Sequence, residues 1–210
     1  MYLNNYITSN ITIVKHVVYH NERPVFENRD ADLSAFLLSA YQYLQVSYPR
    51  FYKMDNLSKL GWLTVEVLLK DSGIKRYKPE EIGLVLSNAN ASLDTDRKYM
   101  QSVTDIPSPA LFVYTLPNIM IGEICIRNNF KGEDAFFIFE KFDAAFIEQY
   151  VNELLNNDVL QTCICGWVDV LKEDYKAVLF LVEKAEKAKA IPFSSKNLQT
   201  IFDNLIIDNI

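Results

Sequence analysis

Short apolar runs alternate along this chain with stretches in which apolar residues recur at helical spacing. Residues 57–68 carry leucine and valine at intervals of three and four, which predicts an amphipathic helix that stops at Gly73. Residues 82–86 form a short continuous apolar run, which is typical of a buried strand. Segments of both kinds alternate to the C-terminus. We therefore expect an α/β fold in which helices cover both faces of a mixed, mostly parallel sheet.

The other segments fit the same scheme. Further strands are expected at residues 7–20, 25–26, 135–139, 159–168 and 177–183. Further helices are expected at residues 32–46, 94–103, 116–128, 142–156 and 197–210, with Asp32 or Ser34 capping the first of these. No linker or repeat divides the chain, so residues 1–210 are expected to form a single domain.

Composition and charge exclude several classes of function. The longest apolar runs, such as residues 177–182, are far too short to cross a bilayer, and the N-terminus lacks a basic region followed by an apolar core. We expect a cytoplasmic protein with no membrane span. The net charge of −6 argues against nucleic-acid binding, which needs a basic face.

The cysteines and histidines do not suggest a metal site. Cys163 and Cys165 lie in an apolar run, Cys125 stands alone, and His16 and His20 have no evident partner ligands. Buried free thiols are the expected state, and neither a metal nor a cofactor is expected.

Five segments occur in the order and spacing of a known family. They are MDNLSKLGWLTVEVLLKDSGI, YKPEEIGLVLSNANASLDTD, YTLPNIMIGEICI, NNDVLQTCICGWVDVL and AVLFLVEKAEKAKA. Together they resemble the N-terminal half of the β-ketoacyl-acyl-carrier-protein synthases of the thiolase-like superfamily, including short ketosynthase-like proteins of aryl-polyene and fatty-acid type pathways. The resemblance covers about residues 51–189, is poor before Phe51 and is absent after Ile191, so residues 191–210 are expected to form an extra helix.

The resemblance also identifies where the family's nucleophile would stand. In these synthases a cysteine follows the glycine of a Gly-Pro-Asn-type turn by nine residues; here the turn is Gly132-Glu133-Asp134, and the ninth residue is Lys141. The interval from Gly132 to Gly166, 34 residues, matches the family without a gap. The family's two catalytic histidines belong to its second half, and neither His16 nor His20 corresponds to them. The resemblance thus implies a ketosynthase-like half without the condensing residues.

The helix after Lys141 has a polar side. At about 100° per residue, an arc of about 140° contains Lys141, Glu148, Gln149, Asn152, Glu153 and Asn156. In complete synthases this helix is covered on both sides. We therefore expect this arc to face water or a polar partner, with Phe142 as an apolar exception that marks a contact.

Glycine is scarce where the family is rich in it. Residues 87–92, Ser-Asn-Ala-Asn-Ala-Ser, replace a glycine-rich loop, and Trp167 replaces the second glycine of a Gly-Gly pair. Because glycine permits close backbone approach, its loss suggests that no acyl chain passes here. Two other chemistries stay open: Asp94 and Asp96 as an acid–base pair or as a helix cap, and Ser92 as a nucleophile.

Two surfaces are candidates for protein partners. Acyl carrier proteins are acidic, so the family implies docking either at Arg50 with Lys53 or at a cluster of Lys75, Arg76 and Lys78, although ordinary surface charge explains both. Condensing enzymes dimerise through the strand before the nucleophile. That strand corresponds here to Ala135, Phe136, Phe137, Ile138 and Phe139. We expect a homodimer, or a heterodimer with a ketosynthase, through this strand.

The sequence therefore favours a non-catalytic ketosynthase-like protein. It would bind a ketosynthase or an acyl carrier protein in fatty-acid or polyketide-type synthesis, with aryl-polyene synthesis as one such pathway. The alternative is a β-ketoacyl synthase-type acyltransferase, active either with a separate second-half chain or through Lys141 as an imine-forming amine. An adjacent gene for a second-half chain would favour the composite enzyme, and an amine of Lys141 in a closed cavity beside an acid or base would favour catalysis by that residue.

Overall fold

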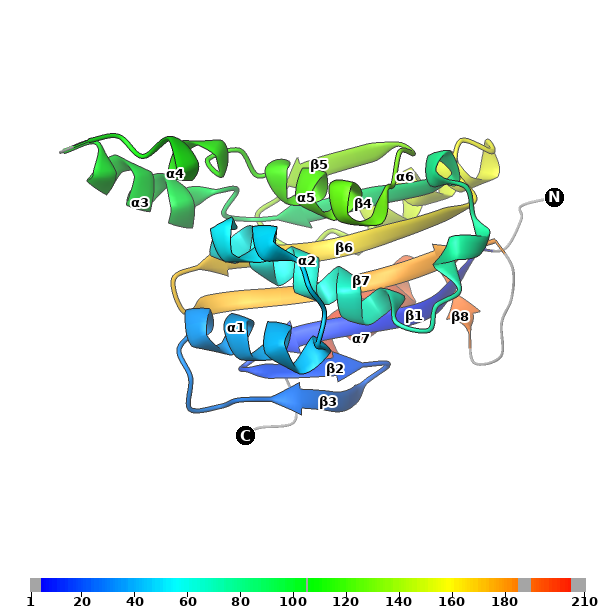
Figure 1. The fold of residues 1–210 in the computed structure, drawn as a ribbon. Coiled ribbons are helices and arrows are strands. Elements are labelled where there is room, and N and C mark those ends of the chain that lie inside the picture. The colour runs from blue at the N-terminus through cyan, green and yellow to red at the C-terminus, as the bar shows by residue number, and fades with distance from the viewer. Residues whose placement is uncertain (1–4, 105, 185–189, 205–210) are drawn as a thin grey trace.

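One mixed sheet organises the molecule. The computed structural model describes residues 5–104, 106–184 and 190–204. The sheet runs in the order β3-β2-β1-β7-β6-β4-β5, and β8 pairs with β1 off this path (Figure 1). The strands are β1 (Tyr6–Val14), β2 (Val17–His20), β3 (Arg23–Glu27), β4 (Ile82–Asn88), β5 (Asp134–Ile138), β6 (Thr162–Leu171), β7 (Asp174–Glu183) and β8 (Ile191–Pro192).

The parallel part of the sheet is confined to one side. β4 pairs in parallel with both β5 and β6, whereas the other described pairings are antiparallel. The expected mixed sheet is therefore confirmed. Five strands (β1, β3, β4, β5 and β6) share one direction, but β7 runs between β1 and β6 in the opposite direction, so parallel neighbours are fewer than expected.

Helices cover both faces, as expected. They are α1 (Leu33–Leu44), α2 (Asn56–Leu69), α3 (Leu93–Ser102), α4 (Pro109–Val113), α5 (Ile119–Asn128), α6 (Ala144–Asn156) and α7 (Ser195–Asn204), with 3-10 turns at Pro49–Lys53, Ile74–Arg76 and Pro79–Glu81. α1, α2 and α5 pack on one face, α6 and α7 pack on the other, and α3 and α4 project beyond the sheet as an arm (Figure 1).

Each face has its own hydrophobic core. Along β4, Leu84 and Leu86 belong to the core under α1, α2 and α5, while Val85 between them belongs to the core under α6 and α7. β7 alternates in the same way, with Leu179 on the first side and Phe180 on the second. A strand that is buried on both faces needs apolar residues at every position, which explains the continuous apolar runs in the sequence.

The boundaries of several elements differ from expectation. The strand expected at residues 7–20 is a hairpin, because Lys15 and His16 turn the chain with φ of 48° and 62°. Gly73 does not end the helix before it: α2 already ends at Leu69, and Gly73, with φ of 73°, precedes a 3-10 turn. Asp32 caps α1 as expected, and its side chain accepts a hydrogen bond of 2.8 Å from Ala35 N.

Two later helices start further along the chain than expected. The helix expected from residue 116 starts at Ile119, and the helix expected from residue 142 starts at Ala144. In the second case Asp143 is the N-cap, since its carboxylate accepts a hydrogen bond of 2.9 Å from Phe146 N. A capping side chain needs a non-helical backbone, so the residues before Asp143 lie outside the helix.

Candidate functional site

Lys141 lies in the turn between β5 and α6. Its side chain is exposed, and it lines an open cleft of about 630 Å³ between this turn and the start of α7, where Ser195 and Lys196 form the other wall. The N-terminus of α6 is already capped by the Asp143 carboxylate. A helix N-terminus capped by a carboxylate is poorly suited to stabilise a second anion. The Lys141 amine therefore lies in an open cleft, and the N-terminus of α6 beside it is not free to stabilise an anion such as a reaction intermediate.

Aromatic side chains fill the space next to this turn. Phe142 is buried and stacks on Phe202 of α7, with ring centres 4.5 Å apart. Trp167 packs edge-on against both rings, at 6.3 Å from Phe142 and 6.2 Å from Phe202. Phe142 was expected to mark a contact, and in the structure that contact is with α7 of the same chain. Trp167, which the family resemblance aligns with a glycine, packs against the residue that follows Lys141.

The polar arc of α6 is partly occupied by the chain itself. Glu148 accepts a hydrogen bond of 2.6 Å from Ser195 N at the start of α7. The side-chain amide of Asn5 lies within hydrogen-bonding distance of Asn152 and Asn156. The expectation that the whole arc meets water or a partner is therefore wrong. Of the arc, Lys141, Gln149 and Glu153 are exposed.

The loop after β4 is held by hydrogen bonds from its own side chains and backbone. The Asp169 carboxylate accepts hydrogen bonds from the backbone N–H of Asn90, at 3.0 Å, and from its side-chain amide, at 2.7 Å. Ser87 donates a buried hydrogen bond of 3.0 Å to the carbonyl of Gly166. This loop is therefore stabilised by contacts within the protein, and its polar groups are engaged there.

The alternative catalytic residues have structural partners. Asp94 pairs with Lys98 at 2.6 Å and accepts a hydrogen bond from Lys172 N at 3.0 Å. The Ser92 hydroxyl lies 3.1 Å from the Asp96 carboxylate and 2.7 Å from the Thr115 carbonyl oxygen. Ser92 is the N-cap residue of α3, so the two aspartates lie in the first helical turn and are not its cap.

The cysteines are free thiols. Cys163 and Cys165 are fully buried in β6, and burial raises the pKa of both thiols well above the ordinary value. Cys125 in α5 is half-buried, and burial raises its pKa to about 11. Thiols with raised pKa values are weak nucleophiles near neutral pH. The expectation of free thiols is confirmed, and Cys125 is less buried than the other two.

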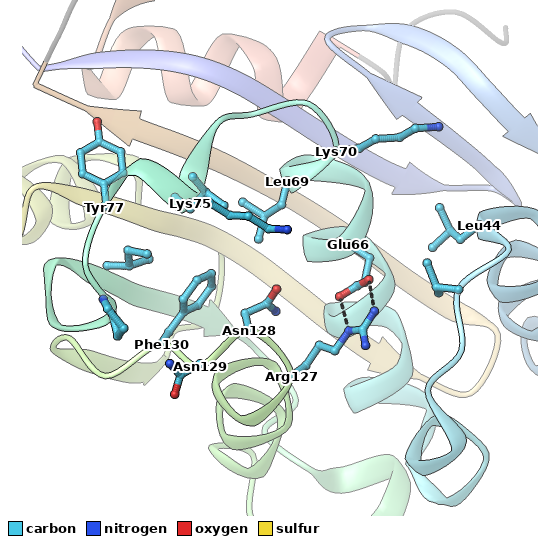
Figure 2. A pocket seen from close by; sticks show the side chains of 14 residues that line it. Leu44, Glu66, Leu69, Lys70, Lys75, Tyr77, Arg127, Asn128, Asn129 and Phe130 are labelled. Carbon is cyan, nitrogen blue, oxygen red and sulfur yellow. Dashed lines mark hydrogen bonds and ion pairs between the residues drawn. The ribbon is translucent and has the colours of Figure 1, made fainter.

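A second cavity, of about 650 Å³, lies on the opposite face of the sheet (Figure 2). Its lining comes from the ends of α1, α2 and α5 and from the segment after Gly73. Apolar residues such as Leu69, Ile82 and Phe130 line it beside the cations Lys70, Lys75 and Arg127. Arg127 forms a two-point ion pair with Glu66, at 3.1 and 3.2 Å (Figure 2). Of these residues, sequence reasoning identified only Lys75 as a candidate site residue.

The residues expected to bind a carrier protein do not act as a uniform basic patch. Arg50 pairs with the buried Glu123 at 3.0 Å, Arg76 pairs with the buried Glu183, and Lys78 lies 3.9 Å from Glu81. Lys53 and Lys75 are exposed. Two of the five cations, Arg50 and Arg76, are therefore paired with buried carboxylates, which reduces the charge that they can offer to a partner.

β5 is an edge strand. It pairs with β4 on one side only and ends the sheet order. Phe136 packs into the core under α5, whereas Phe137 and Phe139 pack on the side of α6. Ile138 remains 56% exposed. The strand expected at residues 135–139 is thus present, shifted by one residue, and its outer edge is accessible.

Comparison with known proteins supports the fold. No protein-family model and no curated protein matches the sequence. Among solved structures, the ishigamide ketosynthase/chain length factor matches with a TM-score of 0.63 and 16% identity, covering 90% of this chain and 64% of its own. The structure of a type II polyketide synthase acyl carrier protein in complex with its ketosynthase contains a chain that matches with a TM-score of 0.60 and 14% identity. The match covers 87% of this chain and 64% of that chain.

A third neighbour is a ketosynthase in complex with its chain length factor from Xenorhabdus doucetiae, with a TM-score of 0.57 and 13% identity, covering 87% of this chain and 80% of that one. The chain thus spans 64% of the length of the first two neighbours. Each match covers at least 87% of this chain, which is more than residues 51–189 alone, so the structural similarity extends beyond the segments that carry the sequence resemblance. The chain has the thiolase-like fold of the ketosynthases.

Proposed function

We propose that this protein is a non-catalytic ketosynthase-like partner in fatty-acid or polyketide-type synthesis, and that it acts in the cytoplasm by binding a ketosynthase. The observation that supports this most directly is the state of the nucleophile position. Lys141 is exposed there, and Phe142, Trp167 and Phe202 fill the adjacent space. An amine that attacks a carbonyl must lose its proton, which an enclosed, low-dielectric site promotes and an open cleft does not.

The nature of the structural neighbours supports a partner role. Two of the matched structures contain a ketosynthase with a chain length factor, and one contains a ketosynthase with its acyl carrier protein. By analogy, this chain would take the place of the subunit without condensing chemistry. An aryl-polyene pathway, and binding of an acyl carrier protein through Lys53 or Lys75, are finer proposals on the same basis.

The two edges of the sheet differ in a way that supports pairing at β5. β3, at the far edge, contains Pro24 and the charged residues Arg23 and Glu27, which discourage the addition of another strand. β5 presents an apolar strand with no proline. In addition, Met100, Ile106, Phe112 and Leu116 on the arm formed by α3 and α4 are more than half exposed. We propose that β5, together with this arm, contacts the ketosynthase.

Covalent labelling tests the absence of catalysis. The protein is incubated with acyl- and β-ketoacyl-pantetheine thioesters, treated with borohydride to trap imines, and measured by intact mass spectrometry. We expect no acyl or imine adduct on the wild-type protein. The mass of Lys141→Ala should likewise be unchanged by the incubation. An adduct that maps to Lys141 and disappears in Lys141→Ala would contradict the proposal and favour the acyltransferase alternative.

Co-purification tests the partner role. The protein carries an affinity tag in its native cell, and the recovered complex is analysed by mass spectrometry and native electrophoresis. A stoichiometric ketosynthase is the expected companion. Recovery of the protein alone from cells that express the pathway's ketosynthase would count against it.

A further inference from the structure

The cavity in Figure 2 has apolar walls and a volume suited to a small molecule. Its volume of about 650 Å³ lies within the range of about 300–1,000 Å³ that is typical of ligand sites. The walls include Leu44, Val46, Leu69, Ile82 and Phe130. The first three of these are only partly buried by the rest of the chain. An occupant would therefore remove apolar surface from water, which favours binding.

The charge of the lining is opposite in sign to that of the chain. The described lining contains the cations Lys70, Lys75 and Arg127. It contains one carboxylate, that of Glu66, so its net charge is about +2 at neutral pH. The whole chain has a net charge of −6. A concave site of one charge sign concentrates ligands of the other sign, so this lining favours an anion.

Two of these cations have structural roles. Arg127 lies in the last turn of α5 and pairs with Glu66 at 3.1 and 3.2 Å. Its guanidinium group also lies over the rings of Tyr48 and Trp62, at 5.1 and 5.7 Å from their centres. Lys70 directly follows α2, and its side chain extends away from the other labelled residues in Figure 2. Both cations complement the partial negative charge of a helix C-terminus.

Lys75 is the remaining cation of the lining. It belongs to the 3-10 turn Ile74–Arg76, beyond the end of α2. Within the described part of the chain it takes part in no ion pair. Its ammonium group lies among the labelled side chains of the cavity (Figure 2). This group is therefore available to an anion that enters the cavity.

The backbone at the helix ends gives no reason for a cationic ligand. At the end of α5, the carbonyl of Cys125 accepts hydrogen bonds from the N–H groups of Asn129 and Phe130. At the end of α2, Ser72 donates to the carbonyl of Leu69 from its N–H group, at 3.1 Å, and from its hydroxyl, at 2.9 Å. These carbonyls thus already have donors within the protein.

We propose that this cavity binds a small aromatic anion, whose rings pack against Leu69 and Phe130 and whose anionic head pairs with Lys75. Aromatic rings suit the site because Phe130 and Tyr77 line it, and because a rigid body loses little conformational freedom on binding. An ammonium group pairs with either a carboxylate or a phosphate. The inference goes beyond the proposed function, since this cavity and the cleft at Lys141 lie on opposite faces of the sheet.

A ligand series tests the preference for an anion. Naphthoate is the probe, naphthamide and naphthylmethylamine are its neutral and cationic analogues, and naphthyl phosphate carries the alternative head. Each is titrated into the isotope-labelled protein at low salt, and the chemical shifts of the amides report the site. Naphthoate should bind with a Kd of about 10–100 µM and shift the amides of Leu69, Lys75 and Phe130. Naphthamide should bind about tenfold more weakly, and naphthylmethylamine more weakly still. The tighter of the two anions identifies the head group.

Lysine variants test which cation pairs with the ligand. Lys75→Glu should weaken naphthoate binding about tenfold or more, whereas Lys75→Arg should keep it within about threefold. Lys70→Glu and Lys53→Glu change the net charge equally, and each should weaken binding by less than about threefold. Lys70 extends away from the other labelled residues, and Lys53 does not line the cavity. The effect of Lys75→Glu should shrink as salt rises from about 0.05 to 0.5 M. Melting temperatures establish that each variant is folded.

Three contrary results would overturn the inference. Naphthamide that binds as tightly as naphthoate would show that the cavity selects only for apolar surface. Naphthylmethylamine that binds more tightly than both would show that the helix C-termini dominate the charge of the site. Absence of binding at about 1 mM, or shifts confined to the turn around Lys141, would show that no site exists in this cavity. None of these results bears on the proposed function, which rests on the state of the Lys141 position.

Discussion

The close approach of β6 to β7 depends on one residue. Gly166 has φ of 142°, and a Cβ atom at this position would lie 2.1 Å from the carbonyl oxygen of Val178. Both facts exclude any other residue without movement of the backbone. The family resemblance places a glycine at this position, and in this structure glycine is required because a side chain would collide with the backbone of β7.

Gly166→Ala should therefore destabilise the protein by about 3 kcal/mol, because the sheet must deform or the strands must separate. Chemical denaturation followed by circular dichroism measures the change. Gly122→Ala is the matched control, since a Cβ there meets nothing within 4 Å and alanine favours the helix. Equal stability of wild type and Gly166→Ala would show that the approach of the strands is not tight.

Lys176 makes stability depend on pH. Its ammonium group donates a hydrogen bond of 2.6 Å to the carbonyl of Phe202 and lies 3.6 Å from the centre of that ring. Burial lowers the pKa of Lys176 to about 8, from an ordinary value of 10.5. Between these values the unfolded chain binds more protons than the folded chain, so the free energy of unfolding rises with pH.

We expect the free energy of unfolding to increase from pH 8 toward about pH 10, and Lys176→Met to flatten this part of the profile. The window closes near pH 10, where tyrosines such as Tyr77 have pKa values raised by burial and begin to act in the opposite sense. Urea denaturation at several pH values measures the slope. A profile with the same slope in Lys176→Met would assign the effect to other groups.

At the scale of elements, the sequence predicted most helices and strands but not how they are used. Continuous apolar runs revealed β4, β6 and β7, because strands buried on both faces leave a strong signal. The hairpin at Lys15 and His16 was missed because this pair lacks the Asn-Gly pattern of two-residue turns. The polar side of α6 was misread as exposed because its partners, Asn5 and Ser195, are far away in the sequence.

The cavity in Figure 2 is another feature that the sequence alone could not predict. Four separate segments form it, and each contains only ordinary apolar, polar and charged residues. The ends of α1, α2 and α5 converge there, and cations near helix C-termini complement the partial negative charge of the backbone carbonyls. Such residues carry no motif, so only the tertiary structure brings them together.

α7 is expected to act as a cover for the core beneath it. Phe202 stacks on Phe142, and Leu198 and Ile201 are buried against the same core. Deleting residues 191–210 should lower the melting temperature, increase binding of an apolar dye and shift the emission of Trp167 to the red, since that ring would meet water. Trp62 lies in the other core and should contribute little to the shift.

Phe202→Ala provides a milder test if the truncated protein does not fold. It should lower the free energy of unfolding by about 1–3 kcal/mol, less than for a fully buried phenylalanine because Phe202 is half-buried. Gln199→Ala, on the same helix, serves as the control. Unchanged stability of Phe202→Ala would mean that α7 rests on the core without stabilising it.

At the scale of the whole molecule, the sheet has one protected edge and one accessible edge. Ile138→Arg, at the accessible edge, should abolish association with a ketosynthase while leaving the melting temperature within about 2 °C, since the side chain is 56% exposed. Ile126→Arg is the matched control, because Ile126 on α5 is 60% exposed. Size-exclusion chromatography with light scattering measures both, and loss of binding in the control alone would place the interface on α5.

The contacts of α6 with Asn5 and Ser195 have a consequence for biosynthesis. α6 receives part of its lining from a residue that is synthesised before it and part from a helix that is synthesised after it. Until the ribosome has released that helix, the rings of Phe142 and Trp167 have no cover. The nascent chain therefore exposes these aromatic rings until α7 has been synthesised, and chaperones that hold apolar segments should bind it at that stage.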